Sequence, residues 1–498
     1  LNQRTTYTYN RWEKVETATD PLGRVTTYVY DNEGYQTEVI DPMGFRTTTV
    51  YNAAKQKIAD VDALGNRTSY TYDTSGRLSA VQDARGSRTT YAYDAKSQVV
   101  SIINALGFIT TSQYDSVGRL TTTISASGAT EVTVYDQAGQ VSAAIDPLGF
   151  RTTSVYDDAG NLIENQNAAG SRTTYVMASN ANRAEAVVDA LGMRTTSVYN
   201  LASQFTASID PSGGRTTYQY DAAGQLTTVI NALGFSMVNG YDAAGRQVEQ
   251  KDQLGRISTT VYDSAGQTQA HVTPLGRRTT YTYDLNGRQT EVKDPLGRVS
   301  TTVFNAAGQV EAVVDPLGFR TTFTYDATGN RTVSLNPRGY RSTTSYDALN
   351  RVSSEQDALG FFTTYSYDSV GSSTEILNPL GGRISMVYSL RREMTEIQDP
   401  LGRRTTYTYG PTGQRETRKL PLGDVTTYSY DAVGRPSTTL YADGSRVTQA
   451  YDVLGSRTTL VDSTGTTTFT YDALSRVTGR IDPGRSEEHT SELQSPCN

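Results

Sequence analysis

The chain has 498 residues, a formal net charge of −7 and a sequence pI of about 5.2, so its overall field repels nucleic acid and anionic membrane surfaces. Hydrophobic residues make up 36% of the sequence, and no segment approaches the roughly 18 apolar residues that a membrane-spanning helix requires. These values argue against a nucleic-acid-binding protein and against a membrane span within this sequence.

The composition is uniform up to residue 484 and changes at Arg485, where the sequence becomes RSEEHTSELQSPCN. This tail, residues 485–498, resembles a translated sequencing adapter, so we expect it to be a disordered artefact outside the fold. The only cysteine, Cys497, and one of the two histidines, His489, lie in it. With His271 as the single histidine of the remainder, we expect no disulfide, no thiol chemistry and no zinc site.

An aromatic anchor, usually Tyr followed by Asp or Asn, recurs every 21 residues, with one step of 22 and one of 20, which gives 23 anchors. A period of this length indicates a repeat array rather than separate domains. The anchors are Tyr9, Tyr30, Tyr51, Tyr72, Tyr93, Tyr114, Tyr135, Tyr156, Met177, Tyr199, Tyr220, Tyr241, Tyr262, Tyr283, Phe304, Tyr325, Tyr346, Tyr367, Tyr388, Tyr409, Tyr430, Tyr451 and Tyr471. We therefore expect one array over residues 1–484. Because it opens at Leu1 in mid-pattern, we expect it to be incomplete at both ends.

Each copy contains two turn signals. The first turn follows the anchor, as in Tyr283–Arg288 (YDLNGR), where Asp can accept hydrogen bonds from the backbone ahead and Gly can adopt a left-handed conformation. The second turn lies about ten residues later, as in Asp294–Arg298 (DPLGR), where Pro supplies the required φ near −65°. Twelve of the 15 prolines occupy this second turn. Both segments are predicted to be four-residue turns.

The segments between the turns have about six and seven residues and are rich in Thr, Tyr and Val, which predicts strands. In Arg404–Tyr409 the alternation places Thr405, Tyr407 and Tyr409 on one face. Twenty-three copies give about 46 strands, or roughly 220 Å of sheet, and open sheets rarely exceed about ten strands without curling. We predict an all-β fold of tandem β-hairpin repeats, one continuous antiparallel sheet coiled into a spiral or shell, with successive layers or a hollow interior sheltering one face.

Two phase slips fall at turns. The extra residue lies between Ala178 and Asn182, in a degenerate first turn, and the missing residue follows Gly465, in a second turn. We expect the turns to absorb both, because a one-residue slip within a strand would move its side chains to the opposite face.

Three recurring residue types are candidate binding sites. The tyrosine ladder could stack on sugars, although cross-strand packing is the favoured interpretation. The turn aspartates are about ten residues apart, which suits turn capping better than a calcium loop. Arginines at strand starts could bind phosphate or glycosaminoglycan, although pairing with neighbouring acidic residues is favoured. These arginines are Arg172, Arg194, Arg215, Arg278 and Arg341.

His271 is interpreted as a surface residue and Trp12 as a packing residue. The sequence contains no serine elbow and no second histidine outside the tail, and no copy breaks the pattern to form an acidic cluster. We therefore assign no catalytic residue, no cofactor-binding residue and no metal ligand, and we expect no cofactor and no enzyme activity.

The cores Tyr72–Arg77, Tyr114–Arg119, Tyr241–Arg246 and Tyr430–Arg435, with intervening Asp-Pro-Leu-Gly, resemble the YD repeats of Rhs proteins over residues 1–484. That family includes bacterial Rhs polymorphic toxins, the C component of Tc toxins, wall-associated proteins and teneurins. The resemblance implies a spiralling β shell that can enclose a C-terminal cargo. The sequence lacks the terminal core segment, the self-cleavage aspartate and the variable C-terminal domain of the toxins.

The resemblance implies a non-catalytic scaffold from a large bacterial protein that is secreted or lies at the cell surface, with a C-terminal toxin domain as candidate cargo in the full-length protein. The alternative is a carbohydrate-binding or cell-contact adhesin, which would use exposed Tyr and Arg rows to bind glycans or cell-surface partners.

Overall fold

The computed structural model describes residues 4–179 and 182–484. Every regular element in this part of the chain is a β-strand, and each strand pairs antiparallel with the next, so that 46 strands form one continuous sheet. The predicted fold class is therefore confirmed. The tail expected to be an artefact, residues 485–498, lies outside the described residues.

The strands alternate between a short type that follows the first turn and a longer type that follows the second turn. Strands β1 to β24 are β1 (Thr6–Tyr9), β2 (Val15–Thr19), β3 (Val25–Tyr30), β4 (Gln36–Ile40), β5 (Arg46–Tyr51), β6 (Lys57–Val61), β7 (Arg67–Tyr72), β8 (Leu78–Gln82), β9 (Arg88–Tyr93), β10 (Val99–Ile103), β11 (Ile109–Tyr114), β12 (Leu120–Ile124), β13 (Thr130–Tyr135), β14 (Val141–Ile145), β15 (Arg151–Tyr156), β16 (Leu162–Gln166), β17 (Arg172–Met177), β18 (Ala184–Val188), β19 (Arg194–Tyr199), β20 (Phe205–Ile209), β21 (Arg215–Tyr220), β22 (Leu226–Ile230), β23 (Ser236–Tyr241) and β24 (Gln247–Lys251). Strands β25 to β46 are β25 (Ile257–Tyr262), β26 (Thr268–Val272), β27 (Arg278–Tyr283), β28 (Gln289–Lys293), β29 (Val299–Phe304), β30 (Val310–Val314), β31 (Arg320–Tyr325), β32 (Arg331–Leu335), β33 (Arg341–Tyr346), β34 (Val352–Gln356), β35 (Phe362–Tyr367), β36 (Ser373–Leu377), β37 (Arg383–Tyr388), β38 (Met394–Gln398), β39 (Arg404–Tyr409), β40 (Arg415–Lys419), β41 (Val425–Tyr430), β42 (Pro436–Leu440), β43 (Arg446–Tyr451), β44 (Arg457–Asp462), β45 (Gly465–Tyr471) and β46 (Val477–Ile481).

Both predicted turns form through the predicted contacts. In the first turn after β27, the Gly287 amide donates to the Asp284 carbonyl at 3.0 Å, and Gly287 has a φ of 79°. The Asp284 carboxylate caps the turn by accepting from the amides of Asn286 and Arg288, at 2.9 and 3.0 Å. The second turn after β28 has the same geometry around Asp294. Turn capping therefore accounts for these recurring aspartates.

Each hairpin around a first turn contains a β-bulge at the anchor. In the second copy Val29 pairs with Glu38, but Tyr30 pairs with Gln36, so Thr37 is left without a partner across the ladder. The same shift recurs at the anchor of the other copies, for example at Tyr72 and Tyr325. Because a bulge increases the local right-handed twist, its regular repetition favours a coiled sheet over a flat one.

Consecutive copies are joined over only part of their strand length. Strands β2 and β3 pair from Thr19 opposite Val25 to Thr17 opposite Thr27, at the end near the second turn. Their backbone pairing stops there, and the carbonyl of Val15 accepts a hydrogen bond from the Tyr30 hydroxyl at 2.8 Å instead. The anchor side chain thus replaces the backbone ladder at the end near the first turn.

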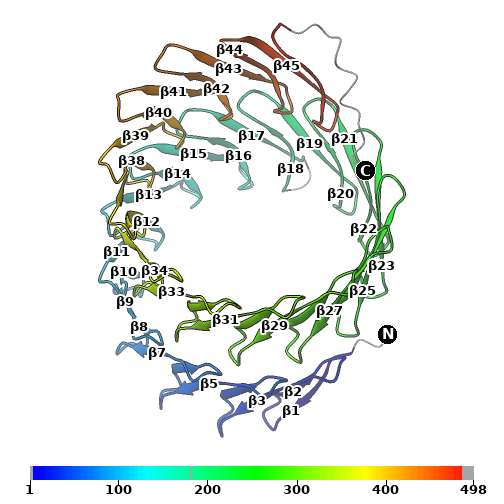
Figure 1. Cartoon of the computed structure of the whole chain (residues 1–498), viewed down its shortest axis with the longest axis vertical. Coiled ribbons are helices and arrows are strands. Elements are labelled where there is room, and N and C mark those ends of the chain that lie inside the picture. Colours follow the sequence, from blue (N-terminus) through cyan, green and yellow to red (C-terminus); the bar gives the residue numbers. More distant parts are fainter. Residues whose placement is uncertain (1–3, 180–181, 485–498) are drawn as a thin grey trace.

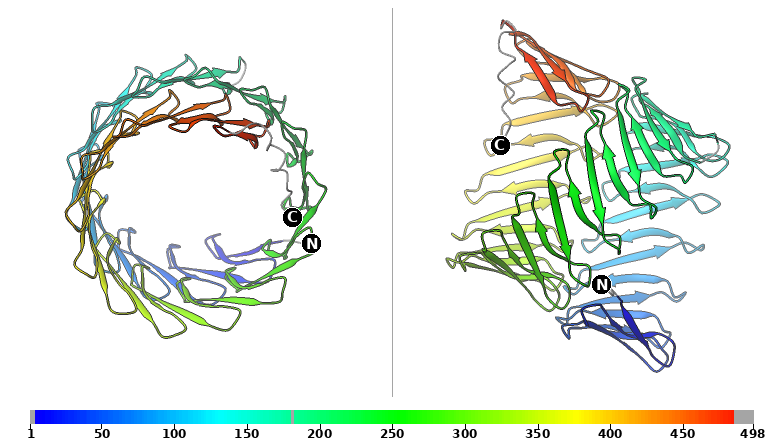
Figure 2. Two further views of the ribbon diagram at one scale, coloured as in Figure 1. Left: turned by 45° about the horizontal axis from the view of Figure 1, so that its top comes forward. Right: turned by 90° about the vertical axis from the view of Figure 1, so that its right-hand side faces the viewer.

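The sheet winds almost twice around a common axis and appears as a ring when viewed from one end (Figure 1). Hydrogen bonds between the two windings join residues that are 243 to 265 positions apart, which corresponds to about twelve 21-residue copies per winding. The right-hand view of Figure 2 shows the second winding beside the first, edge to edge, rather than covering one of its faces. No element of the described chain occupies the middle of the ring (Figure 1).

The wall of this ring is a single layer of sheet. The chain exposes 29175 Å² of surface, well above the ~18,000 Å² expected of a compact monomer of its mass. Among the described residues no large side chain is fully buried, and the most buried positions are alanines at the centre of the short strands, such as Ala59, Ala207 and Ala270. The sequence predicted either stacked layers of sheet or a hollow interior, and the spiral has a hollow interior.

Both phase slips are absorbed at turns, as predicted. In the degenerate first turn the Ala178 amide donates to the carbonyl of Arg183, five residues ahead, where other copies bond four residues ahead. Near the C-terminus the second turn shrinks to two residues between Asp462 and Gly465, which pair with each other. The strands on either side keep their register.

Candidate functional site: the seam between the windings

The anchor tyrosines are used for contacts between copies. Seventeen of them donate their hydroxyl to the backbone carbonyl that begins the short strand of the preceding copy, at 2.7 to 3.1 Å. Tyr72, for example, donates to Lys57. The predicted tyrosine column therefore has a structural role, but it acts through hydroxyl-to-backbone hydrogen bonds as well as through packing.

The residue that closes the first turn also reaches into the next copy. Where it is Arg, as in Arg77, it pairs with its own Asp73 at 2.7 Å, donates to the Asp94 carbonyl at 3.1 Å and lies 4.6 Å from the centre of the Tyr93 ring. Where it is Gln, as in Gln98, its amide donates to the Gly118 carbonyl of the next copy at 2.9 Å. Guanidinium groups thus cover part of the aromatic column, an arrangement that stabilises each ring through cation–π attraction.

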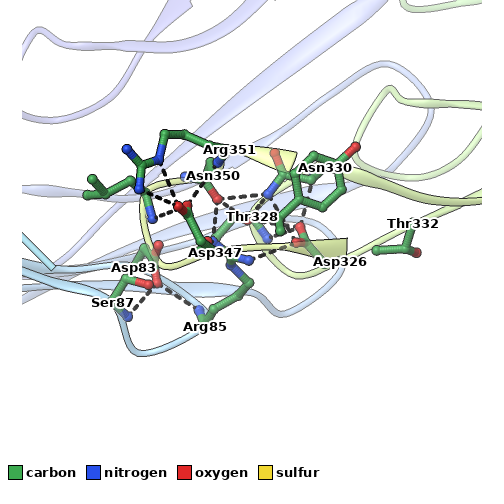
Figure 3. A network of polar contacts seen from close by, with 12 residues as sticks. Asp83, Arg85, Ser87, Asp326, Thr328, Asn330, Thr332, Asp347, Asn350 and Arg351 are labelled. Atoms are coloured by element: carbon green, nitrogen blue, oxygen red, sulfur yellow. Dashed lines mark hydrogen bonds and ion pairs between the residues drawn. The ribbon is translucent and has the colours of Figure 1, made fainter. Parts of the chain in front are cut away.

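The seam is the contact between second turns of the first winding and first turns of the second winding. Its most connected part is built around Arg85, which occupies the position where most second turns have Leu (Figure 3). Its Nη2 atom donates to the Asp347 carbonyl at 2.7 Å and to Asn350 Oδ1 at 2.6 Å. Its Nη1 atom lies 3.4 Å from Asp326 Oδ2. One side chain from the turn after β8 therefore joins two consecutive first turns, those after β31 and β33.

Hydrogen bonds within the second winding hold in place the acceptor groups that bind Arg85. Asn350 Oδ1 also accepts from Asn330 Nδ2 at 2.7 Å and from Thr328 Oγ1 at 3.1 Å. Asn350 adopts a φ of 62°, in the left-handed region where other copies have Gly. Asn tolerates this conformation better than most residues, and here its amide supplies an acceptor that Gly lacks.

Burial opposes ionisation of Asp326, but hydrogen bonds from the Asn330 side chain and backbone and from Thr328 outweigh it, so the pKa of Asp326 lies below its usual value. The same balance holds for Asp347, where the opposing contacts come from the side chain and backbone of Arg351. Both carboxylates are therefore charged at neutral pH and face a permanently charged guanidinium.

Other copies add contacts along the seam. Near its start, Arg24 donates to Gln267 Oε1 at 2.9 Å and Asn286 donates to Asp41 Oδ2 at 2.5 Å. Further along, Arg391 reaches from the second winding to Asp146 Oδ2 at 3.3 Å.

The contact along the seam is interrupted by crevices. One crevice of about 770 Å³ lies between the turns around Asp41 and Asp62 in the first winding and those around Ala307 and Ala327 in the second. Two further crevices of about 500 and 430 Å³ lie beside Arg391 and beside Gln414. Their lining combines turn carboxylates, amides and alanines, which resembles the rest of the seam rather than a shaped ligand pocket.

The candidate binding residues lie apart from one another. Arg172, Arg194, Arg215, Arg278 and Arg341 each begin a strand and are exposed. Arg172 Nη1 lies 3.4 Å from Glu164 Oε1 on the neighbouring strand, in agreement with the predicted pairing with acidic residues. His271 is exposed in β26, and the Trp12 ring lies so close to Gly34 of the next copy that a Cβ atom there would come within 3.3 Å of it, which agrees with the packing role. Within residues 4–179 and 182–484, no three acidic, His or Cys side chains gather closely enough to hold a metal ion.

Sequence reasoning missed the seam residues. Their signal was present as departures from the repeat: Arg85 replaces the turn leucine, and Ser389-Leu390-Arg391-Arg392 replaces the usual Asp-x-x-Gly. The sequence alone does not show that Arg85 meets residues about 260 positions further along the chain.

The model of the teneurin YD-shell family matches residues 2–130 and 278–491, which is more than half of the chain, and the RHS repeat model matches residues 199–236. A comparison with curated proteins finds no significant match. Two solved structures share the fold at 15% sequence identity, and each is matched over 96% of this chain and 35% of its own. They are TcdB2-TccC3 without its hypervariable C-terminal region, at a TM-score of 0.78, and the Photorhabdus luminescens Tc holotoxin pore, at 0.77. This chain therefore spans about a third of those chains.

Proposed function

The chain belongs to the teneurin YD-shell family, and from this premise we propose that it is the wall of a protein shell, a scaffold that surrounds a polypeptide cargo. One observation carries the proposal: a single sheet closes edge to edge through the seam while its middle contains no element of the described chain (Figure 1). A wall with this geometry separates an interior from bulk solvent without any chemistry of its own.

The distribution of polar groups supports a non-catalytic role. The turn carboxylates are occupied by backbone amides and arginines, and the anchor hydroxyls are occupied by backbone carbonyls. In an enzyme, by contrast, titratable groups with shifted pKa values converge in one pocket.

The cargo we propose is a C-terminal domain of the full-length protein, by analogy with the shells of the similar structures. One of those structures is named for the absence of a hypervariable C-terminal region, which indicates that such a region exists in that protein. A cell-surface or secreted location is part of the same proposal. The part of the chain that the structure describes contains no helix able to cross a membrane.

The contacts of the aromatic column do not favour the glycan-binding alternative. Sugar binding needs open aromatic faces, whereas arginines lie 4.4 to 4.8 Å from the ring centres of six anchors. We therefore retain the shell as the single proposed function.

Protection of a cargo tests the proposal. A flexible reporter peptide with one protease site is fused to the C-terminus of the chain, and its cleavage rate is compared with that of the free reporter. We expect cleavage to slow several-fold, and to recover in the double variant Arg85→Ala and Arg391→Ala, which loosens the seam. Arg338→Ala, in an exposed second turn of the second winding, is the matched control. Cleavage at the rate of the free reporter in the unmodified chain would contradict the proposal.

A further inference from the structure

The leucine of the second turn has two different environments. In the first winding six such leucines, from Leu22 to Leu233, are 38–49% exposed, whereas in the second winding eight, from Leu254 to Leu422, are 68–93% exposed. The turn around them is of the same type in both windings, with Gly at a φ between 74° and 98° and the same backbone hydrogen bonds. The environment therefore changes without a change in local structure.

The second winding lies against the second turns of the first winding, and this contact explains the lower exposure of the leucines there. A seam partner at the smallest observed separation, the 241 residues between Arg85 and Asp326, would be Leu474 for Leu233, inside the described chain, but residue 495, outside the described residues, for Leu254. The leucines are thus half-covered wherever first turns of a further winding lie against them. Beyond that point they form an exposed apolar row, here called the leucine rim: the second turns from Leu254 to Leu422.

Aromatic side chains accompany the leucine rim. Phe319, Tyr340 and Phe361, two residues after their turn leucine or its equivalent, are more than half exposed. One of their counterparts in the first winding, Phe150, is half-buried, and the Arg391 guanidinium lies 5.3 Å from its ring centre across the seam.

The opposite rim of the spiral shows the complementary pattern. It consists of the first turns of the first winding and is called the first-turn rim. Val117 on this rim is 74% exposed, whereas Val433, at the same turn position within the seam, is 38% exposed. Leu201 on this rim is fully exposed, and its counterpart Leu390 is partly covered. The leucine rim therefore consists of second turns and the first-turn rim of first turns, and these two turn types cover each other in the seam.

We propose that a second copy of this chain stacks on the leucine rim head to tail, placing its own first-turn rim there and repeating the seam between molecules. The argument is continuity with an existing interface, since the same two turn types already bind each other within one chain through contacts such as Arg24 with Gln267.

Such a contact is heterologous, because the two surfaces are different. Heterologous contacts that do not close into a ring generate open filaments. The expected assembly is a rod that continues the spiral, and this expectation does not depend on whether the shell encloses a cargo.

The mass of the chain in solution tests the proposal directly. In sedimentation velocity we expect the average mass to rise with concentration to at least twice the 54.2 kDa of one chain. The double variant Leu317→Asp and Leu380→Asp should remain monomeric with unchanged circular dichroism, since both side chains are largely exposed. Val387→Asp, an exposed residue on the face of β37, is the control and should assemble normally. A monomeric unmodified chain at every concentration would overturn the proposal.

A mixing experiment tests the head-to-tail polarity. The variant of the leucine rim is mixed with a variant of the first-turn rim, Val117→Asp and Leu201→Asp. Each alone should be monomeric, but the mixture should form a dimer and nothing larger, because only one pair of intact rims remains. If either variant dimerised alone, the contact would join identical rims, and the head-to-tail arrangement would be wrong.

Discussion

The Tyr72 hydroxyl donates to the Lys57 carbonyl of the preceding copy at 2.7 Å, at the place where the backbone ladder between the two copies has ended. The contact recurs along the array, so the bond between neighbouring copies combines a short backbone ladder with one side-chain hydrogen bond. Removing that hydroxyl should weaken the junction without creating a large cavity.

Tyr72→Phe should lower the free energy of unfolding of the local copies by about 1 kcal/mol, the typical value of one such hydrogen bond. Amide hydrogen exchange of β6 and β7 measures the effect locally, which matters because a long array does not unfold as one unit. The chain offers the reverse substitution as a control. Phe304 is a natural anchor without a hydroxyl, and Phe304→Tyr should slow exchange in its own copies. Equal exchange in Tyr72→Phe and the unmodified chain would show that the hydrogen bond contributes nothing.

Ser203→Gly should stabilise the first turn between β19 and β20 by roughly 1 kcal/mol, because Ser203 has a φ of 61° and a left-handed conformation costs about 1–2 kcal/mol for a residue with a Cβ atom. Thermal denaturation followed by circular dichroism measures the change. The reverse substitution Gly224→Ser, in the next first turn, should destabilise the chain, since Gly224 has a φ of 82°. A lower melting temperature for Ser203→Gly would contradict this interpretation.

Arg85→Ala should open the seam locally, because it removes the hydrogen bonds to the Asp347 carbonyl and Asn350 and leaves Asp326 without its partner across the seam. Faster amide exchange in the turn that ends at Arg351 is the expected result, with exchange in β8 and β9 nearly unchanged. Arg338→Ala makes the same change in an exposed second turn and should leave exchange unaltered. If both variants behaved alike, Arg85 would not be a seam contact in solution.

Acidic pH should lower the stability of the repeat array. Burial opposes ionisation of Asp20, Asp326, Asp347 and Asp431, but hydrogen bonds outweigh it and lower the pKa of each carboxyl below 3.8, with the charge of a neighbouring arginine adding to the effect at all of them except Asp326. A lowered pKa in the folded state means that the stabilisation is complete above pH 3.8 and is lost as the pH falls through the folded value. The urea midpoint should thus be constant between pH 7 and 5 and fall below about pH 4.

Asparagine provides the control for this pH dependence, because Asn305 and Asn336 occupy the same turn position naturally. Replacing the four aspartates with Asn should keep the turn hydrogen bonds and make the acid limb of the profile less steep. An equally steep acid loss in that variant would assign the effect to other carboxylates.

The repeat determined most of the local structure. The 21-residue period, the Asp and Gly of the first turn and the Asp-Pro-Leu-Gly of the second turn predicted 46 strands and the turns between them, and these predictions are confirmed. Turn geometry and strand alternation depend on residues close in sequence, which is why they could be derived from it. The bulge at the anchor and the hydrogen bond from the tyrosine hydroxyl to the backbone carbonyl were not predicted, since both depend on the angle between neighbouring strands.

Only the tertiary structure decided how many copies make one winding and which turns meet across the seam. The curvature per copy is a small angle set by twist and bulge, and its sum over about twelve copies determines where the chain meets itself. Identical turn leucines are therefore half-covered in one winding and exposed in the next, although nothing in their own sequence distinguishes them. The sequence determined each copy and its bond to the next copy, whereas the closure of the wall arises from contacts about 250 residues apart that no local pattern encodes.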